Sequence, residues 1–306
     1  DSGFPVCYGE KGILHLKLTK EEIRSSIINF KAGDSFNTIG QKALITIDKA
    51  SIEEDRIKLF TKDKNIKVIN EKEKVTFLAK GKGSHVCMVE NSENPIGVLI
   101  DYLIKNNILS TELPLLESIL KFTIDSYGIA AKLNTSNTAS DKLTGGITMI
   151  EKSGNDLNMY MDYRYPILDH SGKEMDGDFL VKKIVNICSQ ADIKVEVLKH
   201  SRPVHINKDH KIIKRLTETY QKTSGFKNGP FTMGGGTYAR ILPNSFAYGM
   251  ALPNKKIYRV KKGHGDYHQP DESIHIKDLL DAIVIYVESL KALNTVDLSN
   301  INLLKG

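Results

Sequence analysis

The chain has 306 residues, which allows one large domain or two ordinary ones, and its 40% hydrophobic and 26% charged residues are typical of a globular protein. The net charge of +6 comes from lysines spread along the whole chain, whereas nucleic-acid binding favours a one-signed patch with interleaved aromatic residues. No apolar run approaches the roughly 20 residues of a membrane helix. The composition therefore predicts neither a nucleic-acid partner nor a membrane partner.

The three cysteines, Cys7, Cys87 and Cys188, are odd in number and far apart, and no CxxC pair occurs. This spacing argues against a zinc ribbon and against a disulfide framework. The first residues also lack the basic and apolar segments of a secretory signal. The sequence predicts buried thiols in a reducing, cytoplasmic location.

Strands and helices alternate over the first two thirds of the chain. The alternation of apolar and polar residues predicts strands at 13–20, 43–50, 55–62, 66–72 and 74–82, and later at 146–152, 157–166 and 193–200. Helices are predicted at 95–107, at 113–128 with Gly128 after its last turn, and at 176–190 with Phe179, Ile184 and Ile187 among its apolar positions. This order predicts a mixed α/β protein.

The composition changes near Ser201-Arg202-Pro203, where we place a domain boundary. Beyond it, Asp209 is predicted to cap a helix that ends at Gly225. A last helix at about 273–293 has six apolar residues at helical spacing: Ile276, Leu279, Leu280, Ile283, Val287 and Leu290.

Five short motifs contain residue types suited to chemistry. They are DSGFPVCYGEKG (1–12), GKGSHVC (81–87), YMDYRYPI (160–167), FTMGGGTYAR (231–240) and GHGDYHQPDE (263–272). The glycine run does not open a helix, so it does not match a dinucleotide-binding fingerprint. A metal site would need ligands that converge from several of these motifs.

Each motif also has an ordinary structural explanation when it is taken alone. For Asp1 it is a disordered chain end. His85 fits a surface residue, and a histidine before the last helix fits a cap. Arg164 fits a structural ion pair, although its planar fork also suits a carboxylate. The glycines at 234–236 fit either a tight turn or a backbone that a ligand approaches closely.

In this order, the five motifs resemble those of the dinuclear zinc metallopeptidases that include aminoacylases, carboxypeptidases and dipeptidases. The resemblance spans essentially the whole chain, and it is strongest to bacterial dipeptidase V and the carnosinase-like aminoacyl-histidine dipeptidases. It implies an α/β fold in which a lid domain of two α/β sandwich-like halves, at 13–200, is inserted into a catalytic domain. Residues 1–12 and 201–306 would then form part of that catalytic domain.

The resemblance also implies an activity and a set of site residues. The family hydrolyses the peptide bond of short peptides with a free C-terminus, by means of a water that bridges two zinc ions, and manganese can replace zinc. Asp1 and His268 match one metal ligand for each ion. His85 matches the lid histidine that polarises the scissile carbonyl.

Two further motifs match the residues that hold the dipeptide substrate. Arg164 matches the arginine that takes the C-terminal carboxylate of the substrate. Gly234 and Gly235 match the glycines whose backbone meets the same carboxylate. An aminoacylase or carboxypeptidase of the same fold, and a catalytically inactive binding or scaffold module, are the alternatives to a dipeptidase.

The sequence departs from the family in two places. Around His85 the family has small residues followed by Pro and Gly, where this chain has Val86, Cys87 and Val89. The family's remaining metal ligands and its general-base glutamate precede the Asp-x-x-Phe-Pro motif, with which this chain begins. We therefore expect a C-terminal portion that is inactive alone, whose partner is the missing N-terminal segment, in an enzyme whose doubled lid keeps it monomeric.

Overall fold

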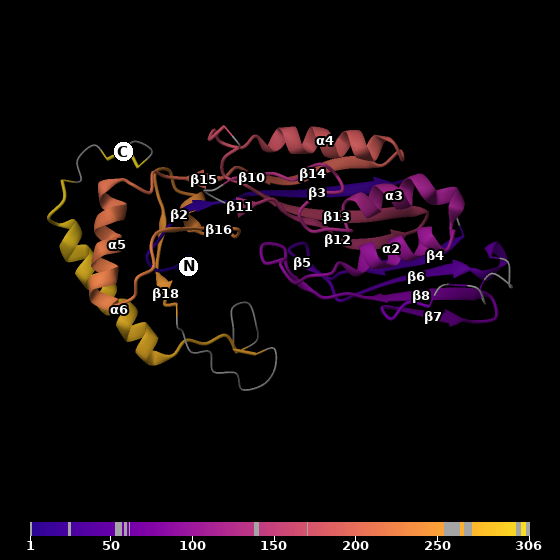
Figure 1. Ribbon diagram of the computed structural model, residues 1–306, viewed down its shortest axis with the longest axis horizontal. Helices are drawn as coiled ribbons and strands as arrows, with labels where there is room; N and C mark the ends of the chain where they lie inside the picture. Colours follow the sequence, from indigo (N-terminus) through magenta and orange to yellow (C-terminus); the bar gives the residue numbers. More distant parts are fainter. Residues whose placement is uncertain are drawn as a thin grey trace. The chain divides into compact units, whose positions relative to one another are not determined.

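The computed structural model describes residues 2–23, 26–52, 57, 60, 62–137, 141–169, 171–253, 264–265, 271–297 and 301–303. The chain divides into two compact units, which Figure 1 shows as ribbons. Gly12–Arg202 form the central unit, and Asp1–Lys11 together with Pro203–Gly306 form the terminal unit.

The central unit is built on an eight-stranded sheet in which every neighbouring pair is antiparallel. The strand order is β14-β3-β13-β12-β4-β6-β8-β7 (Figure 1). The bounds are β3 Gly12–Lys20, β4 Ile27–Ala32, β6 Lys42–Asp48, β7 Ile66–Asn70, β8 Lys74–Lys80, β12 Thr144–Ser153, β13 Asp156–Tyr165 and β14 Lys194–Ser201. Short pairs accompany the sheet: β5 Thr38–Ile39 with β9 Ser84–His85, and β10 Ser136–Asn137 with β11 Asp141–Lys142.

The two halves expected from the sequence share this one sheet. Strands β4, β6, β8 and β7 form one half, and strands β12, β13, β3 and β14 form the other. The halves join where β4 pairs with β12, through Ala32 opposite Ile150 and Lys31 opposite Glu151. The sheet is therefore continuous across the junction.

Three helices cover one face of the sheet: α2 (Pro95–Lys105), α3 (Leu113–Lys121) and α4 (Gly177–Ser189) (Figure 1). Alternate strand residues, such as Leu14, Leu16 and Leu18 of β3, are buried and form a single hydrophobic core with residues from all three helices. The period of two in the strands explains this burial, since it turns every second side chain towards the helices.

Helix α3 is shorter than the sequence predicted, because it ends at Lys121 and not near Gly128. The carboxylate of Asp125 accepts hydrogen bonds from the backbone N–H groups of Tyr127, Ile129 and Ala130 at 2.8–2.9 Å. These bonds offer the backbone an alternative to the helix.

Helix α4 forms where the sequence predicted a helix, with Asp176 as its N-cap, and of the apolar residues named from the sequence Ile184 and Ile187 contribute to the core. Leu180, Ile184 and Cys188 are buried, whereas Phe179 is 47% exposed. The Phe179 ring lies under the Lys183 ammonium group, which is 4.6 Å from the ring centre.

The terminal unit is centred on β2 (Val6–Glu10). This strand pairs with β15 (Val204–His205), β16 (Phe231–Met233) and β17 (Ala247–Tyr248), and β1 (Ser2–Gly3) pairs with β18 (Met250–Ala251). Helices α5 (Lys211–Ser224) and α6 (Ile276–Leu293) contact each other. The short helices within the described part of the chain are η1 Lys49–Ser51, η2 Ser110–Glu112 and η3 Tyr238–Arg240.

Helix α5 ends as the sequence predicted, at Gly225 in the left-handed conformation with φ of 77°. Its N-cap is His210 and not Asp209, so that prediction was wrong. Nδ1 of His210 accepts a hydrogen bond from the Ile212 N–H at 3.2 Å, and His210 is buried. A charged aspartate carboxylate would be costly to bury at this position, whereas a neutral imidazole ring is less costly.

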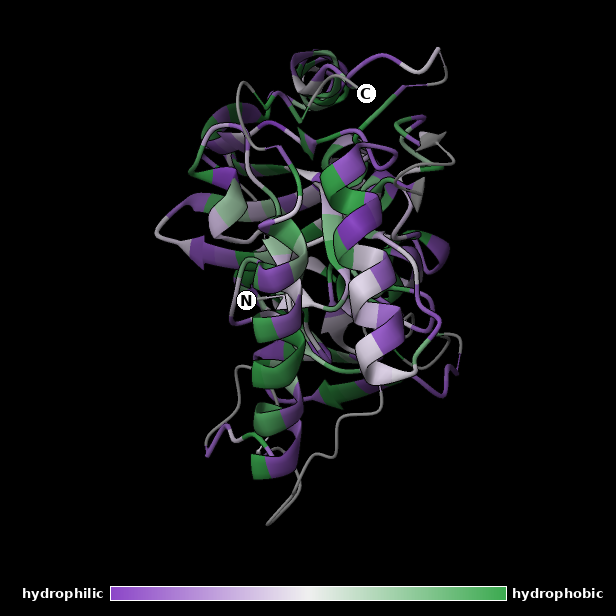
Figure 2. Cartoon of the chain, turned by 90° about the vertical axis from the view of Figure 1, so that its left-hand side faces the viewer, coloured by the Kyte–Doolittle hydropathy of each residue, from purple (hydrophilic) through white to green (hydrophobic). Residues whose placement is uncertain are grey.

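The six apolar residues that the sequence places at helical spacing on α6 lie on the surface of the terminal unit. Ala282, Ile285 and Ser289 form its buried face. The exposed stripe consists of Ile276, Leu279, Leu280, Ile283, Val284, Val287 and Leu290, which are 38–73% exposed. Figure 2 shows hydrophobic residues along α6, the longer of the two helices that face the viewer.

One predicted strand and the lengths of the helices complete the description of the fold. The strand predicted at 55–62 lies largely outside the described residues. Among the described residues, no helix is both long and apolar enough to cross a membrane.

Candidate functional site

The glycine motif is tied to β2 by a buried carboxylate. Glu10 is 1% exposed, and its Oε1 accepts hydrogen bonds from the backbone N–H of Thr237, at 3.1 Å, and from the Thr237 hydroxyl. Its Oε2 accepts from Nε of Arg240 at 3.1 Å, while Nη2 of Arg240 donates to the Lys11 carbonyl at 2.7 Å. Two motifs that are more than 220 residues apart are thereby held together within the terminal unit.

We expect Glu10→Ala to lower the free energy of unfolding by about 3 kcal/mol, because it leaves the Arg240 guanidinium without its buried partner. Urea unfolding followed by circular dichroism measures the change. The matched control is Glu71→Ala, which removes an exposed ion pair with Lys74 and should change stability by less than about 1 kcal/mol. Equal effects of the two substitutions would contradict the anchoring role of Glu10.

Gly234 and Gly235 follow β16 directly and are half-buried. Neither they nor Gly236 are among the described glycines with positive φ, so a left-handed turn does not account for the run. A Cβ atom on Gly235 would meet the Met233 Cε methyl at 3.0 Å, which is the end of a flexible side chain. Close approach of a ligand to this backbone stays a prediction.

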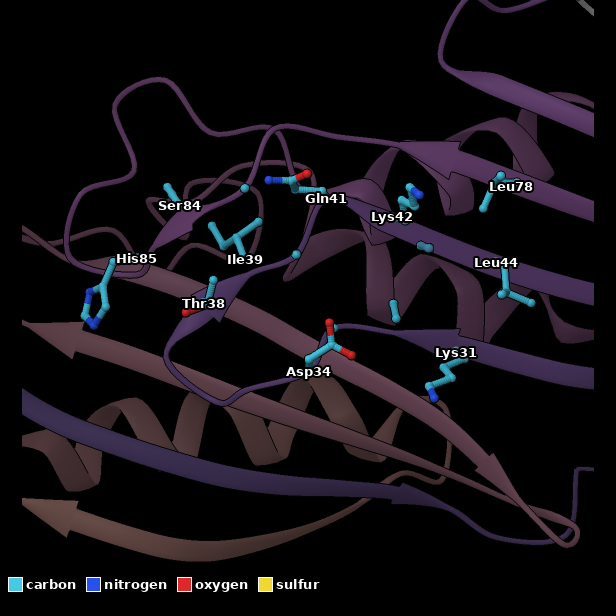
Figure 3. Close-up of a pocket in the computed structure, with 15 residues that line it drawn as sticks. Lys31, Asp34, Thr38, Ile39, Gln41, Lys42, Leu44, Leu78, Ser84 and His85 are labelled. Atoms are coloured by element: carbon cyan, nitrogen blue, oxygen red, sulfur yellow. The ribbon is translucent and has the colours of Figure 1, made fainter. Parts of the chain in front are cut away.

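His85 lies at the end of β9, opposite Thr38 of β5. It is one of 15 residues that line a hollow with a volume of about 620 Å³ in the central unit. Thr38, Ser84, Lys31 and Lys42 also line this hollow. Figure 3 shows His85 at one end of this hollow and Lys31 towards the other. Nδ1 of His85 accepts a hydrogen bond from the backbone N–H of Cys87 at 3.2 Å, and the Cys87 Sγ atom is 2.7 Å from the same nitrogen.

Arg164 is buried in the central unit, where Asp162 holds its guanidinium group by two hydrogen bonds. Nε donates to Oδ1 and Nη2 donates to Oδ2, both at 2.8 Å. The side chain of Asp162 is fully buried, and His15 Nε2 lies 3.2 Å from its Oδ2. This is the structural ion pair that the sequence left open as one interpretation, and it also orients the arginine.

The pKa of Asp162 is lowered. Burial raises it, but the close approach of the His15 ring, the hydrogen bonds from Arg164 and the charge of Arg164 outweigh burial and favour the carboxylate. A carboxylate whose pKa is lower in the folded state than in the unfolded state stabilises the fold when the pH is above the unfolded-state pKa. This stabilisation is lost as the pH falls through the folded-state pKa.

We therefore expect the free energy of unfolding to fall as the pH drops below the ordinary aspartate value of 3.8. In Asp162→Asn, this part of the acid dependence should be absent and the stability at pH 7 should be lower by about 3 kcal/mol, because the Arg164 charge stays buried. Urea unfolding between pH 7 and pH 2.5 measures both effects. An acid dependence that is unchanged in Asp162→Asn would show that other groups cause it.

Asp1 and His268, the two predicted metal ligands, lie outside the described residues. Of the motif around His268, the structure describes His264, Gly265, Asp271 and Glu272, and His264 Nδ1 lies 2.6 Å from Asp271 Oδ2. His85 and Arg164 belong to the central unit, whereas Gly234 and Gly235 belong to the terminal unit.

A sequence model of one peptidase family matches residues 18–292. The chain belongs to Peptidase family M20/M25/M40. Two relatives are each named "Putative dipeptidase": one from Bacillus subtilis (YtjP) is 25% identical over 95% of this chain, and one from Staphylococcus aureus is 22% identical over 96%. The chain spans 62% of the length of each relative. The solved aminoacylhistidine dipeptidase from Vibrio alginolyticus aligns with 95% of this chain and 64% of its own, at 12% identity and a TM-score of 0.48.

Metallopeptidases of family M20 use divalent metal ions. Within the part of the chain that the structure describes, no group of three or more His, Cys, Asp or Glu residues could hold a metal ion. Both ligands that the sequence predicted lie outside that part. The described residues therefore do not make up the family's metal site.

Several residues around the M20 motifs were missed by sequence reasoning. Glu10 lies in the first motif, and Thr237 and Arg240 lie in the glycine motif. The family resemblance assigned no role to these three residues. Asp162, two residues before Arg164 in a strand, was also overlooked, although residues i and i+2 lie on the same face of a strand. That spacing was the signal that could have identified the pair.

Proposed function

We propose that this chain is part of a metal-dependent dipeptidase that hydrolyses the peptide bond of short peptides with a free C-terminus. Its membership of a peptidase family supports hydrolysis, and the names of the two relatives support dipeptides as substrates. Because the chain spans 62% of those relatives, the activity is proposed for the complete protein.

The observation that carries the proposal is the buried, oriented guanidinium group of Arg164. A guanidinium has five N–H donors in a rigid plane, and Asp162 accepts bonds from two of its nitrogens, Nε and Nη2. A planar cation held in this way is suited to a second carboxylate, which it can bind by parallel hydrogen bonds. A free C-terminus is such a carboxylate, and every dipeptide has one.

We assign three further roles from the M20 motifs. The backbone of Gly234 and Gly235 meets the same carboxylate of the substrate. His85 donates a hydrogen bond to the scissile carbonyl, where negative charge develops during hydrolysis. Asp1 and His268 each ligate one of two divalent ions, zinc or manganese.

We propose that a further segment of the same enzyme packs on the exposed stripe of α6. The stripe repeats at 276, 280, 283, 287 and 290, which is the spacing of a helix face that packs against another element. Apolar patches of this kind on a protein surface mark interaction sites. Because the relatives are longer than this chain, we propose that the segment on the α6 stripe belongs to the same polypeptide. We also propose that the enzyme is monomeric and cytoplasmic.

The test is an activity assay of the complete protein, first stripped of metal by a chelator and then supplied with Zn²⁺ or Mn²⁺. We expect rapid, metal-dependent hydrolysis of free dipeptides and little hydrolysis of C-terminally amidated ones. Preferential cleavage of N-acyl amino acids or of longer peptides would favour an aminoacylase or carboxypeptidase. Failure to cleave any of them would favour an inactive binding module.

A further inference from the structure

His85 and Cys87 form a close pair at the start of the loop that follows β9. Two groups of Cys87 meet the same ring nitrogen of His85: the backbone N–H donates to Nδ1 at 3.2 Å, and Sγ lies 2.7 Å from it. Both residues are half-buried, and His85 also lines the hollow of the central unit.

The backbone N–H decides the form of the imidazole ring. A hydrogen bond from an N–H group requires a lone pair on Nδ1, so the proton of the neutral ring is on Nε2. The thiol of Cys87 is a weak donor on the same side of the ring, and its S–H stabilises the same lone pair. If Nδ1 carried the proton, it would face the backbone N–H of Cys87, and of the two Cys87 groups only the weakly accepting sulfur could take its hydrogen bond.

We propose that Cys87 is a positioning residue that holds His85 as the Nε2–H tautomer. The inference rests on the proposed function, in which His85 donates a hydrogen bond to the carbonyl of the substrate. A histidine can donate from Nε2 only when that nitrogen carries the proton, so fixing the tautomer prepares the ring for its role before substrate binds. Cys87 is also a residue at which this chain departs from the small residues of the family pattern.

The first test is nuclear magnetic resonance of the full-length protein labelled with ¹⁵N-histidine. Correlations between ring protons and ring nitrogens distinguish an acceptor nitrogen from a protonated one, and His85→Gln identifies the signals of His85. We expect Nδ1 of His85 to be an acceptor and Nε2 to be protonated. In Cys87→Ala the backbone donor remains but the thiol is lost, so the ratio of Nε2–H to Nδ1–H tautomers should fall about five-fold.

Cys87→Ser keeps a side-chain donor and should restore the ratio, while Met88→Ala, at an exposed neighbouring side chain, should not change it. Chemical modification offers a second route that needs no substitution. Burial raises the pKa of the Cys7 and Cys188 thiols to about 12, so iodoacetamide should modify Cys87 first. The sulfur displaces iodide, the thiol proton passes to the buffer, and the product lacks an S–H donor, as Cys87→Ala does.

The second test is kinetic. In the full-length enzyme, Cys87→Ala should lower kcat for dipeptides about five-fold with little change in KM, and Cys87→Ser should recover most of the loss. An Nδ1–H tautomer in the wild type, or an unchanged tautomer ratio in both Cys87→Ala and the alkylated protein, would overturn the inference. The spectra report on the tautomer of His85 whether or not the protein is a dipeptidase. A fixed tautomer without dipeptide hydrolysis would therefore contradict the proposed function and leave the positioning role of Cys87 intact.

Discussion

Residues 1–306 alone are expected to hydrolyse no dipeptide at a measurable rate and to bind Zn²⁺ or Mn²⁺ only weakly. A catalytic zinc ion takes about three protein ligands. The M20 motifs predict Asp1 and His268 as one ligand for each of two ions, and the described residues contain no group of three or more His, Cys, Asp or Glu residues that could hold a metal ion. We propose that a further segment of the complete enzyme supplies the remaining ligands, since the relatives are longer than this chain.

Two measurements check this expectation. Calorimetric titration of residues 1–306 with each metal should show binding weaker than micromolar, and a dipeptidase assay should show activity only after the additional segment of the enzyme is supplied. Two-site binding at micromolar affinity or better, or turnover by the isolated chain, would show that the chain holds a complete metal site.

The same assay tests the packing of that segment on α6. Ile283 is 48% exposed in the middle of the stripe, so Ile283→Lys should weaken the recovery of activity at least ten-fold at limiting concentrations of the segment. The matched control is Lys291→Ala on the same helix, whose ammonium group pairs with Glu288 on the exposed surface, and this variant should recover activity normally. Normal recovery in Ile283→Lys would place the segment elsewhere.

Arg164→Lys in the complete enzyme is expected to raise KM for free dipeptides by about 10- to 100-fold. Lysine keeps the positive charge but loses the planar fork, and a hydrogen bond to a charged group contributes about 1.5–3 kcal/mol. C-terminally amidated dipeptides have no carboxylate for the arginine, so their already slow hydrolysis should change little. The measurement is steady-state kinetics on a matched pair of free and amidated substrates.

This substitution also disturbs the bonds from Arg164 to Asp162, so the fold needs its own control. Thermal unfolding of Arg164→Lys separates a loss of stability from a loss of substrate binding. Arg215→Lys is the matched control, because Arg215 is exposed on α5 and should leave both KM and stability unchanged. Equal losses on free and amidated substrates would remove the carboxylate-binding role of Arg164.

Local sequence patterns were sufficient to predict most of the strands and helices. Alternation of apolar and polar residues located β3, β8, β12 and β13, and Gly225 marked the end of α5. These features depend on the side-chain period and on the backbone freedom of glycine, which are properties of a few neighbouring residues. The motifs were likewise sufficient to indicate the peptidase family, because they are short and stand in a fixed order.

Only the tertiary structure decided which apolar and charged residues meet. Helical spacing on α6 indicates an apolar face, but spacing does not say whether a partner covers it, and here the stripe is exposed. The bonds from Thr237 and Arg240 to Glu10, and from Arg164 to Asp162, bring charged groups into buried positions that the sequence alone did not suggest. Burial makes such pairs necessary, since an isolated charge inside a protein is costly, and which residues are buried together depends on contacts between distant parts of the chain.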